Sequence, residues 1–266
     1  MKQVVAIYRA EVFSPNSVDK DRAIMDAVTA RLSDRGYAVK SVSEDNLTPD
    51  TQADIFLTMG RRQRTLDLLK AKEASGAVVI NTAESVKACS RSTVDRLMRL
   101  NGIPAAPTEG SDGYWIKRGD AAAQSKADVV FARDEAECDT EIRRMRQRGI
   151  DEIVVTAHVK GDLIKFYGVL GTGFFRTFYP ADDGISKFGD ERINGASMHY
   201  PFSKVSLQRD AEHVARLTGT CVYGGDCIIR SDGTYAIIDF NDFPSFSRCR
   251  EEAGEAITEQ IERLKN

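Results

Sequence analysis

Short apolar runs alternate with amphipathic segments along the first part of the chain. Residues 4–8, 54–59 and 77–81 are apolar runs typical of parallel strands that are buried on both faces. Between the first two runs, residues 24–32 carry Ile, Ala, Val and Leu at helical spacing. This alternation of strand and helix predicts a small open α/β sheet over residues 1–85.

Proline marks the end of this pattern. A helix is predicted at residues 92–100, and Pro104 and Pro107 follow it closely. Because proline disfavours helix at its own position and at the preceding residue, residues 103–108 must be extended. We interpret this segment as a linker between domains.

Beyond the linker the pattern favours antiparallel pairing. The first three strands, with a helix between the second and the third, predict a small β-β-α-β lobe. A turn sequence at residues 231–234, Ser-Asp-Gly-Thr, joins the last two strands into a hairpin. The predicted strands are residues 114–117, 128–131, 153–155, 163–170, 173–179, 226–230 and 235–240, and the helices are residues 136–148 and 206–217.

Composition excludes several classes of partner. The formal net charge of −3 provides no general attraction to nucleic acid or to anionic lipid. No apolar run approaches the roughly 20 residues that span a bilayer, and the N-terminus is too short and polar for a secretory signal. The five cysteines show no Cys-x-x-Cys spacing, which indicates reduced thiols in a cytoplasmic protein. We therefore expect neither a nucleic acid nor a membrane partner.

Two aspartates and an asparagine stand where the C-terminal hairpin brings them together. Asp239 and Asn241 are two residues apart on one strand, so their side chains share a face, and the hairpin places Asp226 alongside. Their oxygens are hard ligands, and an incomplete shell of this kind suits Mg²⁺ that also binds phosphate. The alternative is a strand end whose polar side chains cap the next loop, and Asp226 makes that interpretation the weaker one.

Two lysines lie on predicted strands that precede the hairpin. Lys117 follows Trp115 and Ile116, and Lys165 lies within residues 163–170. A cation among apolar strand residues can neutralise a polyphosphate. The alternative for each is a solvated lysine on an edge strand.

The order of these features resembles the ATP-grasp superfamily, in which two α+β lobes clamp ATP behind a substrate-binding α/β domain. Four segments carry the resemblance. Residues 97–108 resemble the Gly-Ile-Pro entry into the first lobe, and residues 114–117 resemble the strand with the phosphate-binding lysine. Residues 153–159 resemble the hinge that holds adenine, and Asp226 with residues 239–245 resembles the metal-binding end.

The resemblance implies a fold and two cofactors. The fold is the ATP-grasp architecture, mixed α/β and α+β, with an N-terminal substrate domain at 1–85. A first lobe with its linker follows at 86–157, and a C-terminal lobe with the metal site at 158–266. The cofactors are ATP and Mg²⁺, and the implied metal ligands are Asp226, Asp239 and Asn241.

The resemblance also implies the residues around the nucleotide. Lys117 and Lys165 are implied as phosphate-binding and catalytic cations, and Arg91 stands near the place where the family usually has a third lysine. A packed ring is the alternative for the histidine of the hinge. The residues expected at adenine are Val155, Thr156, Ala157, His158 and Val159.

A small anionic substrate is expected at the carboxyl ends of the N-terminal strands. The loop at residues 14–20 lies there, and so do three arginines at a predicted helix start, which suit a carboxylate or a phosphate. The alternative is a solvated basic helix start. The residues expected to bind the substrate are Arg61, Arg62, Arg64, Ser245 and Arg248, with Arg176 as a further catalytic cation.

Three functions remain open from the sequence. A carboxylate substrate attacking the γ-phosphoryl group forms an acylphosphate for ligation to an amine, which is the commoner reaction of the superfamily. A hydroxyl substrate makes the protein a kinase, and Asp239 with the loop at 243–245 resembles the inositol tris/tetrakisphosphate kinase branch. Arg91 and the altered hinge are compatible with a third function, a nucleotide-binding module without turnover.

Overall fold

A computed structural model describes residues 1–14, 17–121, 123, 125–183 and 193–264. The chain begins with the predicted parallel sheet, whose strand order is β2-β1-β3-β4. α1 packs on one face of this sheet and α2 and α3 on the other, which is why the middle strands read as uninterrupted apolar runs. The elements are β1 (Gln3–Tyr8), α1 (Val18–Asp34), β2 (Ala38–Ser43), β3 (Ile55–Thr58), α2 (Gln63–Ala74), β4 (Val78–Ile80) and α3 (Ala83–Ala88).

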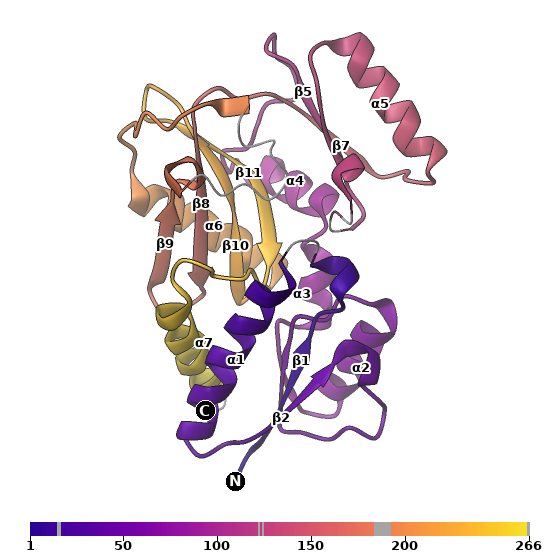
Figure 1. Cartoon of the computed structure of the whole chain (residues 1–266), viewed down its shortest axis with the longest axis vertical. Coiled ribbons are helices and arrows are strands. Elements are labelled where there is room, and N and C mark those ends of the chain that lie inside the picture. Colours follow the sequence, from indigo (N-terminus) through magenta and orange to yellow (C-terminus); the bar gives the residue numbers. More distant parts are fainter. Residues whose placement is uncertain (15–16, 122, 124, 184–192, 265–266) are drawn as a thin grey trace.

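The loop predicted at residues 14–20 is described in part. Residues 15 and 16 lie outside the described residues, and α1 already begins at Val18. The carboxyl ends of β1 and β3 point toward the rest of the molecule (Figure 1).

A small lobe follows, built on an antiparallel sheet of order β6-β5-β7. α5 covers one face of this sheet, where Ile116 and Ala132 pack against Cys138 and Met145. The β-β-α-β prediction is therefore confirmed, and the opposite face of the sheet turns toward the large lobe. The elements are α4 (Arg91–Leu100), β5 (Tyr114–Arg118), β6 (Val129–Ala132), α5 (Glu135–Gln147) and β7 (Ile153–Ala157).

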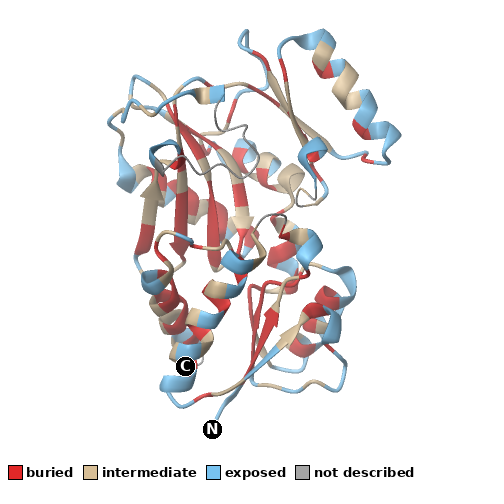
Figure 2. Cartoon of the chain, viewed as in Figure 1, coloured by how far each residue is buried: buried red, intermediate tan, exposed pale blue. Residues whose placement is uncertain are grey.

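The large lobe is a four-stranded antiparallel sheet of order β11-β10-β8-β9. Phe166, Tyr223 and Phe240 lie on the face that packs on Leu207 and Val214 of α6. Figure 2 shows the central strands of this sheet almost wholly buried. The elements are β8 (Asp162–Val169), β9 (Phe174–Phe178), α6 (Lys204–Thr218), β10 (Val222–Ile229), β11 (Tyr235–Asp242) and α7 (Arg250–Leu264).

Contacts between α1 and α7, and between β4 and β10, help to join the N-terminal sheet to the large lobe. α1 and α7 lie side by side, and Arg31 of α1 donates a hydrogen bond to Glu251 of α7 (Figure 1). The buried amide of Asn81 accepts hydrogen bonds from the N–H groups of Cys221 and Val222, at 2.9 Å each, and donates to the carbonyl oxygen of Val222 at 2.8 Å. These contacts hold the start of β10 against the end of β4.

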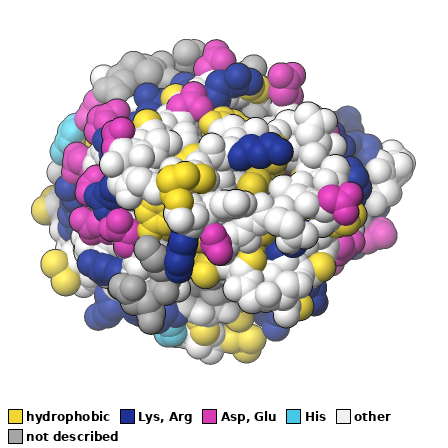
Figure 3. All heavy atoms as spheres, turned by 90° about the horizontal axis from the view of Figure 1, so that it is seen from below, with side chains coloured by type: hydrophobic (Ala, Val, Ile, Leu, Met, Phe, Trp, Pro, Cys, Tyr) yellow, Lys and Arg dark blue, Asp and Glu magenta, His cyan; other side chains and the backbone are white. Residues whose placement is uncertain are grey.

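The surface carries charges of both signs. Figure 3 shows acidic and basic side chains interspersed on the face seen from below, without a region of one sign. No helix in the described part of the chain is long and apolar enough to cross a membrane.

Candidate functional site

One face of the large sheet carries a row of charged side chains. Asp226 of β10 lies opposite Asp239 of β11 on one side and opposite Lys165 of β8 on the other. Residues paired across neighbouring strands point to the same face, and so do residues two apart on one strand. Asn241 therefore faces the same way as Asp239, while Phe240 between them is buried in the aromatic core.

Lys165 is held by its cross-strand neighbour. Its Nζ atom donates to Oδ1 of Asp226 at 2.9 Å, and both side chains are about one quarter exposed. β8 lies between β10 and β9. The alternative of a solvated lysine on an edge strand is therefore wrong for this residue.

Lys117 reaches the same row from the small lobe. It lies on β5, the central strand of its sheet, and its Nζ atom donates to the carbonyl oxygen of Ile238 at 2.7 Å. Burial lowers the pKa of Lys117, an effect that the carboxylate of Asp239 opposes. Lys117 is buried and lies on a central strand, so the alternative of a solvated lysine on an edge strand is wrong for it as well.

Arg91, the first residue of α4, adds a second cation beside Asp239. Its Nη2 atom lies 3.4 Å from Oδ2 of Asp239, and its Nη1 atom donates to the carbonyl oxygen of Arg118 at 3.4 Å. Burial on its own would raise the pKa of Asp239, but the charges of Arg91 and Lys117 outweigh it and hold that pKa below its ordinary value. The carboxylate is therefore ionised at neutral pH.

A small cavity of about 20 Å³ lies between the two lobes at this point. Arg91 and Val94 line it from α4, Lys117 and Thr156 from the small sheet, and Asp239 from β11. A volume of this size holds about one water molecule. The cavity is therefore too small to hold a nucleotide in this structure.

The hinge residues end the small sheet. The N–H of Ala157 donates to the carbonyl oxygen of Pro107 at 2.7 Å, and that of His158 donates to Gly113 at 2.8 Å. Those two groups are thus engaged within the protein, and Val155 and Thr156 pair with Ile116 and Trp115 of β5.

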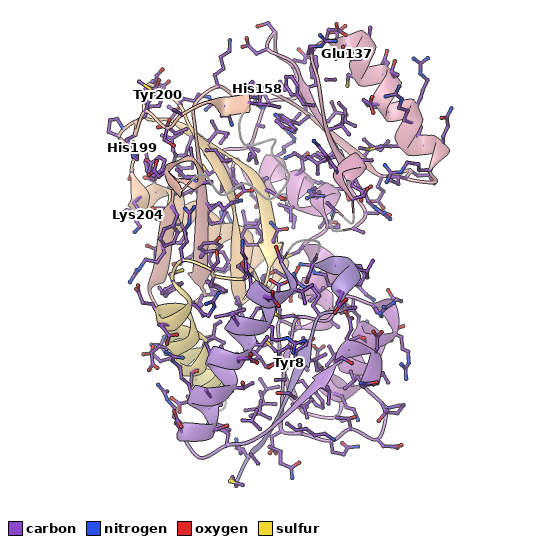
Figure 4. The ribbon with its side chains drawn as sticks, in the orientation of Figure 1. Tyr8, Glu137, His158, His199, Tyr200 and Lys204 are labelled. Atoms are coloured by element: carbon purple, nitrogen blue, oxygen red, sulfur yellow. The ribbon has the colours of Figure 1, made fainter. Side chains whose placement is uncertain are left out.

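An aromatic cluster beside the hinge was missed by the sequence interpretation. The indole N–H of Trp115 donates to Nδ1 of His158 at 3.1 Å, and the ring of Phe131 lies 5.2 Å from Trp115 and 5.6 Å from His158. Trp115 shares a sheet face with Lys117, two residues along β5. That spacing was the available signal. Figure 4 shows His158 where the small lobe meets the large one.

The three arginines expected at the substrate do not converge. Arg61 forms a buried ion pair with Asp242, with Nη2 and Oδ1 2.5 Å apart. Arg62 pairs with Asp45 at the surface, and Arg64 is exposed on α2.

Arg176 of β9 lies over the ring of Phe174, and Arg248 follows β11 in the chain. Arg176 is paired with Glu252 of α7. Arg248 donates to the carbonyl oxygen of Tyr179 at 3.1 Å and lies over the ring of Phe178. Ser245 is half-buried in the loop after β11.

Arg9 lies next to the loop after β11, a position that the sequence interpretation did not anticipate. It directly follows the first apolar run, and its side chain is 9% exposed. It donates to the carbonyl oxygens of Met59 and Phe243, at 3.1 and 3.0 Å, and pairs with Asp21. An arginine at the carboxyl end of a parallel strand was the available signal.

The protein oxygens available to a metal form an incomplete shell. Asp226, Asp239 and Asn241 provide two carboxylates and one amide on one face. Among the described residues no group of three or more His, Cys, Asp or Glu side chains is arranged to hold a metal. By their chemistry, the two carboxylates and the amide are hard oxygen donors of the kind that Mg²⁺ takes together with phosphate and water.

An N-terminal parallel sheet and two lobes that face each other across Lys117 and Asp239 define the ATP-grasp fold, which the chain has over its whole length. A solved structure that shares it is D-alanyl-alanine synthetase A from Vibrio cholerae O1 biovar eltor, at TM-score 0.72 and 11% identity, covering 100% of this chain and 99% of the other. The D-alanine–D-alanine ligase from Coxiella burnetii has a TM-score of 0.65 at 11% identity, over 100% and 97% of the two chains. The ligase from Bacillus anthracis complexed with ATP has a TM-score of 0.66 at 12% identity, over 99% and 97%.

These likenesses confirm the expected fold. No family model matches the sequence, and no curated protein matches it either.

Proposed function

We propose that the protein is an ATP-dependent ligase that activates a small carboxylate for coupling to an amine. The observation that carries the proposal is the charged row of Asp239, Asp226 and Lys165, which faces Lys117 and Arg91 across the two lobes. Two carboxylates opposed by three cations are the groups that a metal-bound triphosphate requires. The three solved relatives are named as synthetases or ligases, which agrees with this reaction class.

Each charged group has a role in binding Mg²⁺ and ATP. Asp226, Asp239 and Asn241 would hold Mg²⁺, which when bound neutralises phosphate charge and orients the triphosphate. Lys117, Lys165 and Arg91 would bind phosphate oxygens. Lys117 is suited to this role because it can exchange the carbonyl oxygen of Ile238 for a charged oxygen when the lobes separate.

The adenine would lie against the small lobe. Val155, Thr156, Ala157, His158 and Val159 remain the proposed hinge, and the half-buried rings of Trp115 and Phe131 extend its apolar surface. We divide the chain into domains at 1–85, 86–157 and 158–266, each with one sheet. The first sheet would serve the substrate, and the other two would lie on either side of ATP.

The reaction has two steps. A carboxylate oxygen of the substrate attacks the γ-phosphorus, the bond to the β-phosphate oxygen breaks, and ADP leaves with that electron pair. An amine then attacks the acylphosphate carbon, the bond from that carbon to the phosphate oxygen breaks, phosphate leaves with that electron pair, and the nitrogen gives up one proton to the departing phosphate or to water. Lys117 and Lys165 stabilise the charge that develops on the transferred group.

The substrate is proposed to approach from the N-terminal sheet. Arg62, Arg64, Ser245 and Arg248 remain its proposed ligands, with Arg176 as a further cation, whereas Arg61 is engaged by Asp242. Arg248 would have to turn from Tyr179, and Arg176 from Glu252, to meet an anion. We place the reaction in the cytoplasm, where the five free thiols stay reduced.

A kinase is the second candidate. The feature that favours it is Asp239, where the superfamily most often has glutamate, followed by Phe-Pro-Ser at residues 243–245, which resembles the inositol tris/tetrakisphosphate kinase branch. In that case a hydroxyl attacks the γ-phosphorus, and the phosphorylated substrate is the final product.

The test is a turnover assay. The protein is incubated with ATP and Mg²⁺ against a panel of amino acids, dipeptides and polyols, and ADP, phosphate and product mass are measured. A ligase releases both ADP and phosphate and joins two substrates, whereas a kinase releases ADP alone and adds one phosphoryl group. Tight ATP binding without turnover on any substrate would instead support the binding module.

A further inference from the structure

Two arginines of the N-terminal sheet reach the end of the strand that carries Asp239 and Asn241. Arg9 follows β1, and its Nη2 atom donates to the carbonyl oxygen of Phe243 at 3.0 Å. Arg61 precedes α2, and its Nη2 atom donates to the carbonyl oxygen of Asp242 at 3.3 Å. These carbonyls belong to the two residues that directly follow Asn241, so both contacts act on the backbone beside a proposed metal ligand.

The direction of Arg9 is set by groups of its own domain. Its Nε atom donates to the carbonyl oxygen of Met59 at 3.1 Å, and its Nη1 atom lies 3.2 Å from Oδ2 of Asp21. Asp21 in turn accepts a hydrogen bond from Ser14 at 2.6 Å. A planar guanidinium held at two points, through Nε and Nη1, leaves Nη2 little freedom, so the position of the Phe243 carbonyl is tied to that of β1.

Arg61 is held in a similar way. Its backbone N–H and that of Arg62 both donate to Oε2 of Glu44 at 2.8 Å, and Glu44 is buried. Its guanidinium lies 2.5 Å from Oδ1 of Asp242, a residue that is 1% exposed. The approach lies outside hydrogen-bond geometry, and among the described residues neither carboxylate oxygen of Asp242 receives a hydrogen bond. Asp242 therefore depends on Arg61 for charge compensation.

The backbone that these arginines hold is strained. Phe243 has φ 37° and Phe246 has φ 47°, in the left-handed region that residues other than glycine rarely adopt. Both rings are fully buried. Such a conformation persists only where the surroundings impose it, and Arg9 bonded to the carbonyl oxygen of Phe243 is one of the contacts that impose it.

We propose that Arg9 and Arg61 are positioning residues that hold the end of β11, so that the N-terminal sheet sets the metal affinity of the large lobe. The inference rests on the proposed Mg²⁺–ATP site. Neither arginine is assigned a contact with the metal or the nucleotide in this role. They act by holding the carbonyl oxygens of Asp242 and Phe243 in place. This fixes the backbone next to Asn241 and so the direction of the Asn241 side chain.

The test measures ATP binding by the full-length protein as a function of Mg²⁺ concentration, using equilibrium dialysis, and repeats it without metal. The variants are Arg9→Met and Arg61→Met. The control is Arg31→Met, which removes another arginine between the N-terminal domain and the large lobe, at the contact with Glu251 of α7 rather than at the end of β11. We expect the Mg²⁺ concentration at half-saturation to rise about tenfold in both test variants, while metal-free ATP binding and the control remain within about twofold of the parent.

If the Mg²⁺ concentration at half-saturation is the same in the parent and in both test variants, the inference is overturned and the proposed function is left intact. An equal rise in Arg31→Met would also overturn it, because loosened domain contact would then suffice. If a methionine variant does not fold, Arg9→Lys and Arg61→Lys decide. The lysine variants keep the positive charge but lose the planar guanidinium. We expect them to raise the Mg²⁺ concentration at half-saturation about threefold. An unchanged concentration would mean that the arginines do not position Asn241. A parent protein that binds no ATP with or without Mg²⁺ would overturn the proposed function, and the inference with it.

Discussion

The Nζ atom of Lys117 donates a hydrogen bond to the carbonyl oxygen of Ile238 at 2.7 Å, joining the small lobe to the strand that carries Asp239. Lys117 is 8% exposed, and the cavity that it lines has a volume of about 20 Å³. The cleft is therefore closed in this structure by a residue that the proposed reaction needs. Opening the cleft exchanges a neutral acceptor for a phosphate oxygen, which is the stronger partner for an ammonium group.

Replacing Lys117 with methionine should lower kcat/KM for ATP turnover by about 100-fold or more, since a donor aimed at the transferring group contributes on that scale. Steady-state kinetics at saturating Mg²⁺ measures the change. Lys70→Met is the matched control, because Lys70 is 62% exposed and pairs with Glu84 at the surface. Parent-like kinetics in Lys117→Met would remove this lysine from the phosphate site.

Replacing Asp239 with alanine should weaken Mg²⁺-dependent ATP binding by about 100-fold, because the metal contributes several kcal/mol. Metal-free ATP binding should weaken less, or even improve, because the variant removes negative charge near the phosphates. Calorimetric titration of ATP with and without Mg²⁺ measures the Mg²⁺-dependent and the metal-free binding separately. If Asp239→Ala binds Mg²⁺ and ATP like the parent, the metal assignment is wrong.

Trp115 should report nucleotide binding. It is the only tryptophan in the chain, and it shares a face of β5 with Lys117. ATP entering the cleft changes the surroundings of its indole, so emission should shift in intensity or wavelength and saturate with ATP. Phe131→Leu keeps an apolar side chain as a control for the ring contact. Emission that is insensitive to saturating ATP would place adenine away from this cluster.

The Trp115–His158 hydrogen bond should be lost at acid pH. Burial lowers the pKa of His158 below 6.5, with Asp112 opposing the effect and Lys160 adding to it. As pH falls below about 6.5 the unfolded chain takes up this proton before the folded protein does, so the free energy of unfolding should decrease. It should be unaffected by this group above that pH. Denaturant unfolding between pH 5 and 8, comparing the parent with His158→Phe, isolates the contribution of this residue, and identical profiles would contradict the assignment.

Replacing Phe240 with alanine should destabilise the protein by about 3–5 kcal/mol, because a fully buried ring leaves a cavity. The ring stacks on Tyr223 at 5.4 Å, on the face opposite Asp239. Urea unfolding measures the loss. Val12→Ala, at a side chain that is 47% exposed, should stay within about 0.5 kcal/mol of the parent. A small effect of Phe240→Ala would mean that the core collapses around the missing ring.

Local sequence predicted much of the charged row. Asp226, Asp239 and Asn241 belong to two strands joined by a short turn, so the alternation of side chains along a strand already places them on one face. Lys117 and Lys165 were recognised as candidate cations for the same local reason, although their strands could not be ranked as edge or central. Strand order depends on pairing between distant segments, which a turn sequence does not encode.

The remaining site residues depended on the tertiary structure. Arg61 looked like a member of a substrate cluster, yet its guanidinium is paired with Asp242, 181 residues away in the sequence. Arg9 carried no motif, and it gains its role only because β1 ends opposite Phe243. The sequence by itself determined the strands, the order of the units and the face shared by Asp226, Asp239 and Asn241, because periodicity and turn chemistry are local. Only the folded chain decided which arginines are available to a ligand, because ion pairs form between groups that long-range packing brings together.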